Sequence, residues 1–118
     1  MLPKINRLAK KKDFDAIFKH GKSVYLPTFL LKYQPNQLRV SRLGVIVSNK
    51  VSKKATLRNS IKRKIREIMR LIWPQIRQGQ DVVVLVSPRI IDNQGKLPSY
   101  QVMTNTLKQA LSRAKLII

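Results

Sequence analysis

The sequence contains no cysteine and no long apolar run. Without cysteine, neither a disulfide frame nor a cysteine-based zinc site can form, and the absence is compatible with a reducing cytosol. The longest fully apolar run, Val82 to Val86, is too short to cross a membrane, and the first twelve residues carry charge without the apolar stretch of a secretion signal. We therefore expect a cytoplasmic protein that does not insert into a membrane.

Acidic residues, histidine and glycine are also scarce, and each shortage argues against a kind of active site. A protein nuclease usually needs clustered carboxylates for metal ions, or histidines for general acid–base work. The single histidine, His20, cannot serve as both acid and base, and the four glycines form no phosphate-binding loop. The five acids are scattered along the chain: Asp13, Asp15, Glu67, Asp81 and Asp92. We expect no catalytic residue and no firmly bound metal or cofactor, so that any catalytic groups would reside in a partner.

Positive charge, by contrast, is abundant. The chain has 25 lysines and arginines against 5 acids, a net charge of +20, and an isoelectric point near 11.3. A compact domain with that charge repels itself, and nucleic acid is the abundant polyanion that relieves the repulsion by releasing counterions. An anionic membrane is the competing partner. We discount it because the apolar positions of the most basic segment are aliphatic and are needed for a core.

The densest positive charge lies in Lys50 to Trp73, which we expect to form one amphipathic helix. Between residues 50 and 70, nine basic residues stand against a single acid, Glu67. At about 100° per residue, six aliphatic residues share one arc of about 120°, and most of the basic residues fall on the opposite side. The expected apolar face is Leu57, Ile61, Ile65, Ile68, Leu71 and Ile72, with Lys64 inside its edge. The opposite side should face a polyanion, because the acids that neutralise a merely solvated face are missing.

The length of 118 residues suits a single domain, residues 1–118. We expect a short helix at 13–20, a strand at 24–33 interrupted by Pro27, a second strand at 38–48, a buried strand at 81–87 and a closing helix from residue 100. The first two strands should form an antiparallel hairpin because their connection is short, and the second and last should be parallel around the basic helix. The order is α-β-β-α-β-α, with an extra edge strand if the first strand splits.

Phe14 and Phe18 lie four residues apart on one face of the first expected helix, which ends before Gly21. Such a pair more often belongs to a core than to a binding site. The lysines around it, however, favour a half-exposed surface on which the bases of a single strand stack. For His20, beside this pair, we expect a capping or surface role.

Three blocks of the sequence stand out together: RNSIKRKIRE at residues 58–67, F-x-x-x-F-K-H-G at residues 14–21 and RLGV at residues 42–45. Together they resemble the bacterial ribonuclease P protein family. Residues 58–67, RNSIKRKIRE, are similar to the signature helix of that family, usually written R-N-R-x-K-R-x-x-R-E, with Ser60 in place of the second arginine. Residues 14–21, with the pattern F-x-x-x-F-K-H-G, and residues 42–45, RLGV, resemble its first helix and second strand. The resemblance covers roughly residues 6–90 and the closing helix.

The resemblance implies an α+β fold, a single-domain α/β sandwich of the ribosomal protein S5 domain 2-like type. Its order is α-β-β-(β)-α-β-α, with a left-handed β-α-β crossover around the signature helix. The implied function is that of the protein subunit of ribonuclease P, an endoribonuclease that removes the 5′ leader from precursor tRNA. The implied partners are the catalytic ribonuclease P RNA and precursor tRNA, and Mg²⁺ would serve the RNA–protein complex, with the hydrolysis performed by the RNA.

The resemblance also implies roles for particular residues. Residues that match the signature, with their basic neighbours, would bind the catalytic RNA: Lys53, Lys54, Arg58, Asn59, Lys62, Arg63, Arg66 and Arg70. A cleft between the sheet and the first helix would hold the single-stranded leader, with Phe14 and Phe18 stacking on its bases. Lys32 occupies a sheet position where some relatives carry an aromatic residue, so that a phosphate contact would replace stacking there.

Other classes of function stay open on the residues alone. A ribosomal protein or a general RNA chaperone would share the charge, the size and the lack of catalytic residues, without requiring these sequence blocks in order. A DNA-binding protein would place the basic helix in a major groove, but it would want a dimer or a helix-turn-helix partner, which the sequence does not plainly offer. A nuclease acting without RNA is disfavoured by the small number of acids.

Overall fold

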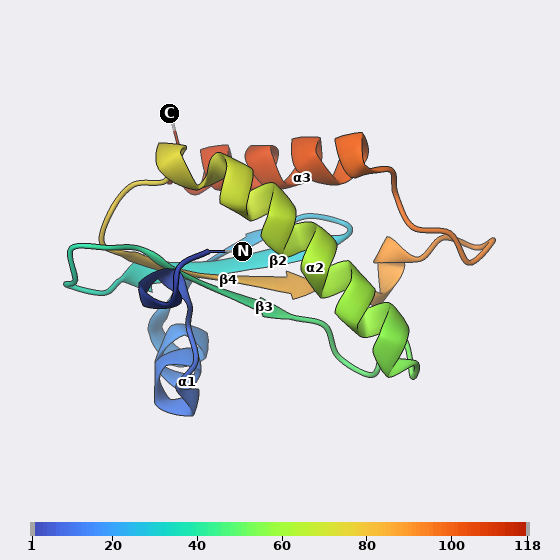
Figure 1. The fold of residues 1–118 in the computed structure, drawn as a ribbon, viewed down its shortest axis with the longest axis horizontal. Coiled ribbons are helices and arrows are strands. Elements are labelled where there is room, and N and C mark those ends of the chain that lie inside the picture. Colours follow the sequence, from blue (N-terminus) through green and yellow to red (C-terminus); the bar gives the residue numbers. More distant parts are fainter. Residues whose placement is uncertain (1, 118) are drawn as a thin grey trace.

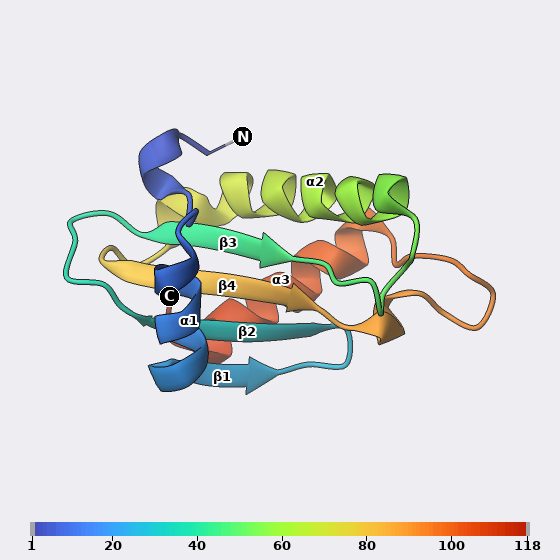
Figure 2. The ribbon, with the colours of Figure 1, turned by 90° about the horizontal axis from the view of Figure 1, so that it is seen from below.

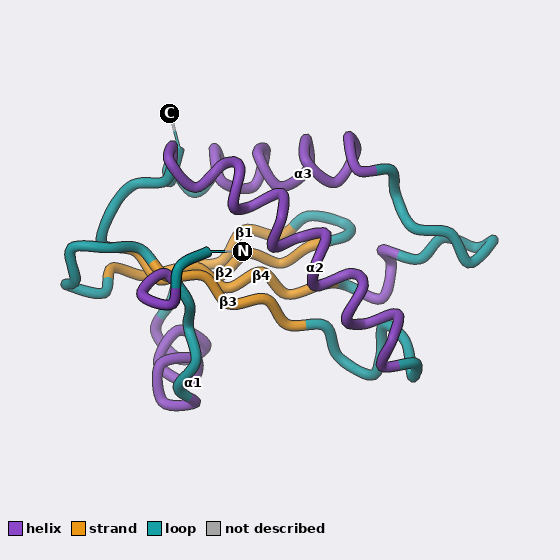
Figure 3. Tube along the Cα trace, viewed as in Figure 1, coloured by secondary structure: helices purple, strands orange, loops and turns teal. Residues whose placement is uncertain are grey.

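The structure is a computed structural model that describes residues 2–117, and it consists of one mixed β-sheet with helices on both faces (Figure 1). The tube view in Figure 3 shows α2 and α3 together above the sheet and α1 below it. The elements are α1 (Lys11–His20), β1 (Lys22–Tyr25), β2 (Phe29–Pro35), β3 (Arg42–Ile46), α2 (Ala55–Ile72), β4 (Gln80–Val86) and α3 (Tyr100–Arg113), with short 3-10 turns at Lys4–Asn6, Trp73–Gln75 and Pro88–Ile90. The α+β class and the element order, including the extra edge strand, are as predicted.

The four strands lie in the order β1-β2-β4-β3, and one predicted pairing is wrong. The strands at 24–33 and 38–48 do not form a hairpin with each other, because β4 lies between β2 and β3 and pairs with both. The hairpin forms instead around Pro27, between β1 and β2, where the Leu26 amide donates to the Phe29 carbonyl. The physical reason lies in β4: Val82, Val83 and Val84 are fully buried, and a strand buried on both faces belongs in the middle of a sheet.

The unit β3-α2-β4 is the parallel crossover that the sequence predicts, with Val45 opposite Val84 in the register. In Figure 2 the helix α1 is nearest the reader, both strands point to the right, and α2 lies behind the sheet as the chain passes from β3 down to β4. That path is left-handed. It is the rare hand for such a connection and the one that the family resemblance implies.

The helix α2 is amphipathic as expected, but its buried arc is rotated from the predicted one. Met69 is completely buried although the prediction left it out, whereas Leu71 is 55% exposed and Lys64 is exposed. On the helical wheel the buried arc runs from about 0° at Leu57 to about 120° at Met69, so its centre lies about 40° from the predicted one. Lys64 therefore reaches solvent without having to pass through the core.

The helix α1 packs on the opposite face of the sheet through Ile17, which is completely buried against Leu8 and Val83. Phe14 is half-buried in the same cluster, and Phe18 is 38% exposed. The helix ends before Gly21, as predicted, but Gly21 has an ordinary φ of −72°. Glycine is needed there for space, because a Cβ atom would lie 2.5 Å from the Ile17 carbonyl oxygen.

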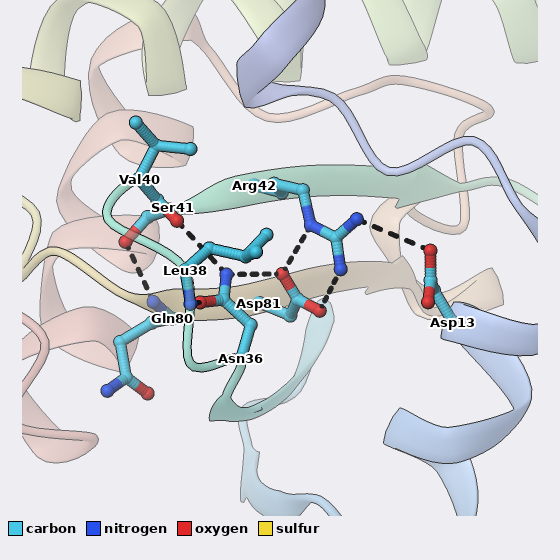
Figure 4. A network of polar contacts seen from close by, with 8 residues as sticks. All are labelled: Asp13, Asn36, Leu38, Val40, Ser41, Arg42, Gln80 and Asp81. Atoms are coloured by element: carbon cyan, nitrogen blue, oxygen red, sulfur yellow. Dashed lines mark hydrogen bonds and ion pairs between the residues drawn. The ribbon is translucent and has the colours of Figure 1, made fainter.

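A polar network joins α1 to the sheet (Figure 4). Asp81 is 3% exposed, and its carboxylate accepts hydrogen bonds from Arg42 Nε at 2.8 Å, Arg42 Nη2 at 2.7 Å and Asn36 Nδ2 at 2.8 Å. Arg42 Nη1 reaches Asp13 Oδ2 on α1 at 3.3 Å. The bonds to Asp81, followed by its charge and that of Asp13, raise the pKa of Arg42 despite partial burial. Arg42 is thus fully engaged and fixes the position of α1 over β3 and β4.

Candidate nucleic-acid interface

The outward side of α2 carries the predicted basic face. Asn59, Arg63 and Arg66 are exposed, and Lys62 is half-buried. Their side chains make no hydrogen bond or ion pair within the part of the chain that the structure describes. Arg70 differs, because its guanidinium holds both carboxylate oxygens of Glu67, at 3.1 Å and 2.6 Å. The middle of α2 therefore presents an unneutralised row of donors.

Among the described residues, the amino end of α2 has neither a capping side chain nor an acid in its first turn. Lys54 is the N-cap residue. The first amide groups of a helix carry a partial positive charge and normally receive a Ser, Asp or Asn cap. Here Lys53 and Lys54, both exposed, add two more positive charges at the same end. Such an end is suited to binding a phosphate.

Arg58 has a structural bond as well as its predicted contact with RNA. Its side chain is half-buried, and Nη1 donates to the Ser52 carbonyl at 2.9 Å, which ties the turn before α2 to the first turn of the helix. Ser60, which stands where the family signature has an arginine, is half-buried on the same helix. Of the predicted residues on α2, Asn59, Lys62, Arg63 and Arg66 thus remain the ones with unengaged side chains.

The predicted leader cleft corresponds to the sheet face on which α1 lies. Figure 2 shows α1 crossing only one end of this face and leaving the rest of the strands open. Phe14 covers Gly44 so closely that a Cβ atom on that residue would lie 2.5 Å from Cε1 of the ring. Lys32, half-buried on β2 opposite Val83, belongs to the same face, and Phe18 reaches solvent from α1. All three predicted cleft residues are thus on the α1 side of the sheet.

Beyond α1, the open face carries one row of apolar side chains that sequence reasoning missed. The register places Tyr25 opposite Leu30, Leu30 opposite Leu85, and Leu85 opposite Ile46. Tyr25 is 73% exposed and, with Leu30 and Leu85, lines a hollow of about 330 Å³. Its exposure could not be read from the sequence, because Tyr25 sits in the segment whose pairing was predicted wrongly.

A second hollow connects the two predicted surfaces. It has a volume of about 230 Å³ and lies among the amino-terminal segment, α1, β3 and α2. Phe14 from the cleft and Arg66 from the signature helix both line it, together with Leu2, Arg7, Leu8, Leu43, Gly44 and Val45. Two side chains that the sequence places 52 positions apart, Phe14 and Arg66, thus meet at one cavity.

Within residues 2–117, no three side chains of the His, Cys, Asp or Glu type gather where they could hold a metal ion. No helix in the same range is long and apolar enough to cross a membrane.

The fold and the site define a small, strongly basic α+β protein with an unneutralised helix face and an open, partly aromatic sheet face. The chain belongs to the ribonuclease P protein family: the sequence model of that family, described as Ribonuclease P, matches residues 2–115. It is accordingly a protein subunit of ribonuclease P, and its family partner is ribonuclease P RNA.

Relatives support this membership in sequence and in structure. The ribonuclease P protein component of Synechocystis is 39% identical over 117 residues, covering 98% of this chain and 90% of the relative. A structure of the Staphylococcus aureus ribonuclease P protein, a mutant described as defective in mRNA degradation activity, has a TM-score of 0.85 at 32% identity, covering 97% of this chain and 92% of that one. The Thermotoga maritima protein has a TM-score of 0.81 at 34% identity, covering 91% and 96%.

Proposed function

We propose that this chain binds the catalytic RNA of ribonuclease P through the outward face and amino end of α2, and the single-stranded 5′ leader of precursor tRNA through the α1 side of the sheet. By holding both RNAs it promotes endonucleolytic removal of the leader, which leaves the mature 5′ end. The hydrolysis is performed by the RNA with its Mg²⁺ ions. The protein supplies binding and orientation, and no reacting group.

The observation that carries this proposal is the uncapped amino end of α2: among residues 2–117, no side chain caps this helix and no acid stands in its first turn. A helix that follows directly on Lys53 and Lys54, with no side-chain cap and no acid in its first turn, is electrostatically unfavourable on its own. A phosphate backbone removes that cost, because each phosphate accepts bonds from the free amides and neutralises the lysines. The open sheet face adds a single-strand surface, where Phe18 and Tyr25 offer rings and Lys32 a charge.

Cleavage of a precursor tRNA at near-physiological Mg²⁺ tests the proposal. Bacterial ribonuclease P RNA alone is compared with the same RNA plus this protein. We expect the protein to restore cleavage at the mature 5′ end, and Arg66→Ala and Phe14→Ala to weaken that effect. Arg39→Ala, an exposed arginine in the loop between β2 and β3, is the matched control and should act like wild type. A protein that binds the RNA without changing cleavage would instead be a general RNA-binding protein.

A further inference from the structure

The cavity between the two proposed RNA-binding surfaces is lined by Phe14 from one surface, by Arg66 from the other, and by Arg7, which belongs to neither. Its lining is largely apolar and includes Leu8, Leu43 and the ring of Phe14, which lies against Gly44. Among the described residues, its charged lining groups are the two guanidiniums of Arg7 and Arg66. An apolar, aromatic lining beside two cations matches a nucleoside joined to a phosphate.

Arg7 is held in place before any ligand arrives. The amino-terminal segment lies along β3 through a parallel bridge between Arg7 and Leu43, and the Leu8 amide donates to the Leu43 carbonyl at 2.9 Å. The Arg7 side chain then turns back, and its Nε donates to the Leu2 carbonyl at 2.9 Å. Its two terminal nitrogens have no partner within residues 2–117. An arginine fixed through Nε presents those two donors in the orientation that a phosphate accepts.

Arg66 lines the same cavity from α2. It is exposed on α2, and its guanidinium has no carboxylate or hydrogen-bond partner in the described part of the chain. Arg42, the first residue of β3, differs from Arg66 because its guanidinium is already paired with Asp81 and Asp13. Two free guanidiniums at one small cavity repel each other unless an anion lies between them.

We propose that this cavity binds one nucleotide of an RNA strand, with its phosphate between Arg7 and Arg66 and its base against Phe14 and the backbone of Gly44. The inference rests on the proposed function, which brings RNA to both sides of the cavity. It adds Arg7, a residue outside the predicted site, to the RNA-contacting set. The volume of about 230 Å³ leaves room for a single base. The nucleotide comes from the leader or from a single-stranded part of the catalytic RNA.

The test compares Arg7→Gln with Arg39→Gln, two exposed arginines that lose the same charge. The first measurement is the affinity of each protein for ribonuclease P RNA. The second is the affinity of each assembled RNA–protein complex for precursor tRNA, with and without a leader. Loss of charge-assisted bonds to one phosphate should cost Arg7→Gln roughly tenfold or more in one of these affinities, and Arg39→Gln less than about twofold. A loss only with leader-bearing tRNA identifies a leader nucleotide, and a loss in RNA affinity identifies the catalytic RNA.

A double-variant cycle separates a shared phosphate from a loosened amino-terminal segment. If Arg7 and Arg66 hold the same phosphate, the Arg7→Gln/Arg66→Gln protein loses less than the product of the two single losses, by roughly threefold or more. The Arg39→Gln/Arg66→Gln losses should multiply. Equal behaviour of Arg7→Gln and Arg39→Gln, or independent losses at Arg7 and Arg66, would overturn the proposal.

Failure of the proposed function would look different. In that case the wild-type protein does not restore cleavage, whether or not it binds ribonuclease P RNA. The three single variants, Arg7→Gln, Arg39→Gln and Arg66→Gln, and the two double variants are then compared for binding of a short oligouridylate by the protein alone. A selective loss with Arg7→Gln, again coupled to Arg66, would keep the nucleotide pocket, and equal affinities for all of them would remove it.

Discussion

The Phe14 ring packs against Gly44 in space that a side chain at residue 44 would occupy. A Cβ atom at residue 44 would lie 2.5 Å from Cε1 and 2.7 Å from Cζ of Phe14, closer than real contacts allow. Gly44→Ala should therefore push the ring away from β3. We expect a loss of stability of about 1–3 kcal/mol from this overpacking, and a weaker affinity for leader-bearing tRNA. Urea unfolding and tRNA binding measure the two effects. Full leader affinity in Gly44→Ala would show that the position of the Phe14 ring does not matter for binding.

Arg42 is predicted to be structural, although it lies in a block that resembles the family. Removing it leaves the Asp81 carboxylate buried with Asn36 as its remaining side-chain partner. We expect Arg42→Met to reduce the free energy of unfolding by about 3–5 kcal/mol, the usual cost of an uncompensated buried charge. Arg39→Met, a nearby surface arginine, should change it by less than about 0.5 kcal/mol. Similar unfolding curves for the two variants would contradict this role for Arg42.

Lys32 is predicted to contact a leader phosphate. Lys32→Ala should weaken binding of leader-bearing tRNA and lower the slope of log affinity against log salt by about 0.7, the contribution of one single-strand phosphate. Lys108→Ala removes an exposed lysine from α3, on the far side of the sheet, and serves as the control. If both variants keep the wild-type affinity and slope, Lys32 makes no phosphate contact.

At the amino end of α2, helix stability and phosphate binding favour opposite charges. An aspartate at the N-cap position accepts bonds from the first amides and favours the helix dipole. Lys54→Asp should therefore stabilise the protein by about 0.5–2 kcal/mol and at the same time weaken its binding to ribonuclease P RNA. Lys108→Asp has the same charge change within α3 and should not stabilise. Thermal unfolding measures the expected gain in stability, and RNA binding measures the expected loss of affinity. An unchanged RNA affinity in Lys54→Asp would argue against a phosphate at this end.

The ion pair within α2 gives a pH dependence of defined sign. The hydrogen bond from Arg70 lowers the pKa of Glu67 from its ordinary value of 4.5. The pair therefore stabilises the fold above pH 4.5, and this contribution is lost as the pH falls through the lowered pKa. Because both groups are on the surface, the effect should be small. Acid titration of stability in wild type and in Glu67→Gln should show a slightly steeper loss in wild type. Parallel curves would mean that the pair contributes nothing.

Element types were predictable from sequence because each depends on local pattern. The valines of β4, the period of α2 and the Pro27 break all indicate structure within a few residues. Strand pairing was harder to predict than element type, because it depends on distant parts of the chain. The short connection between residues 33 and 38 by itself favours a hairpin. The burial of β4 on both faces overrode that local preference and inserted it between β2 and β3.

At the scale of the whole molecule, the site could be predicted only as separate parts. The basic helix and the Phe14/Phe18 pair are visible in the sequence as charge and spacing. Their meeting at one cavity depends on the amino-terminal segment running along β3, which no periodic pattern indicates. The left-handed crossover also follows from global packing. Arg7 and Tyr25 went unnoticed for the same reason, because their exposure and neighbours are set by distant parts of the chain.

We propose that this one small protein holds two RNAs on separable surfaces. The most direct measurement is the preference of the RNA–protein complex for leader-bearing over leaderless tRNA, made alongside the affinity of the protein for ribonuclease P RNA. Phe18→Ala should reduce the leader preference and leave the affinity for ribonuclease P RNA unchanged. Arg63→Ala should do the reverse. Equal losses of both quantities in both variants would contradict the claim and indicate a single, undivided RNA-binding surface.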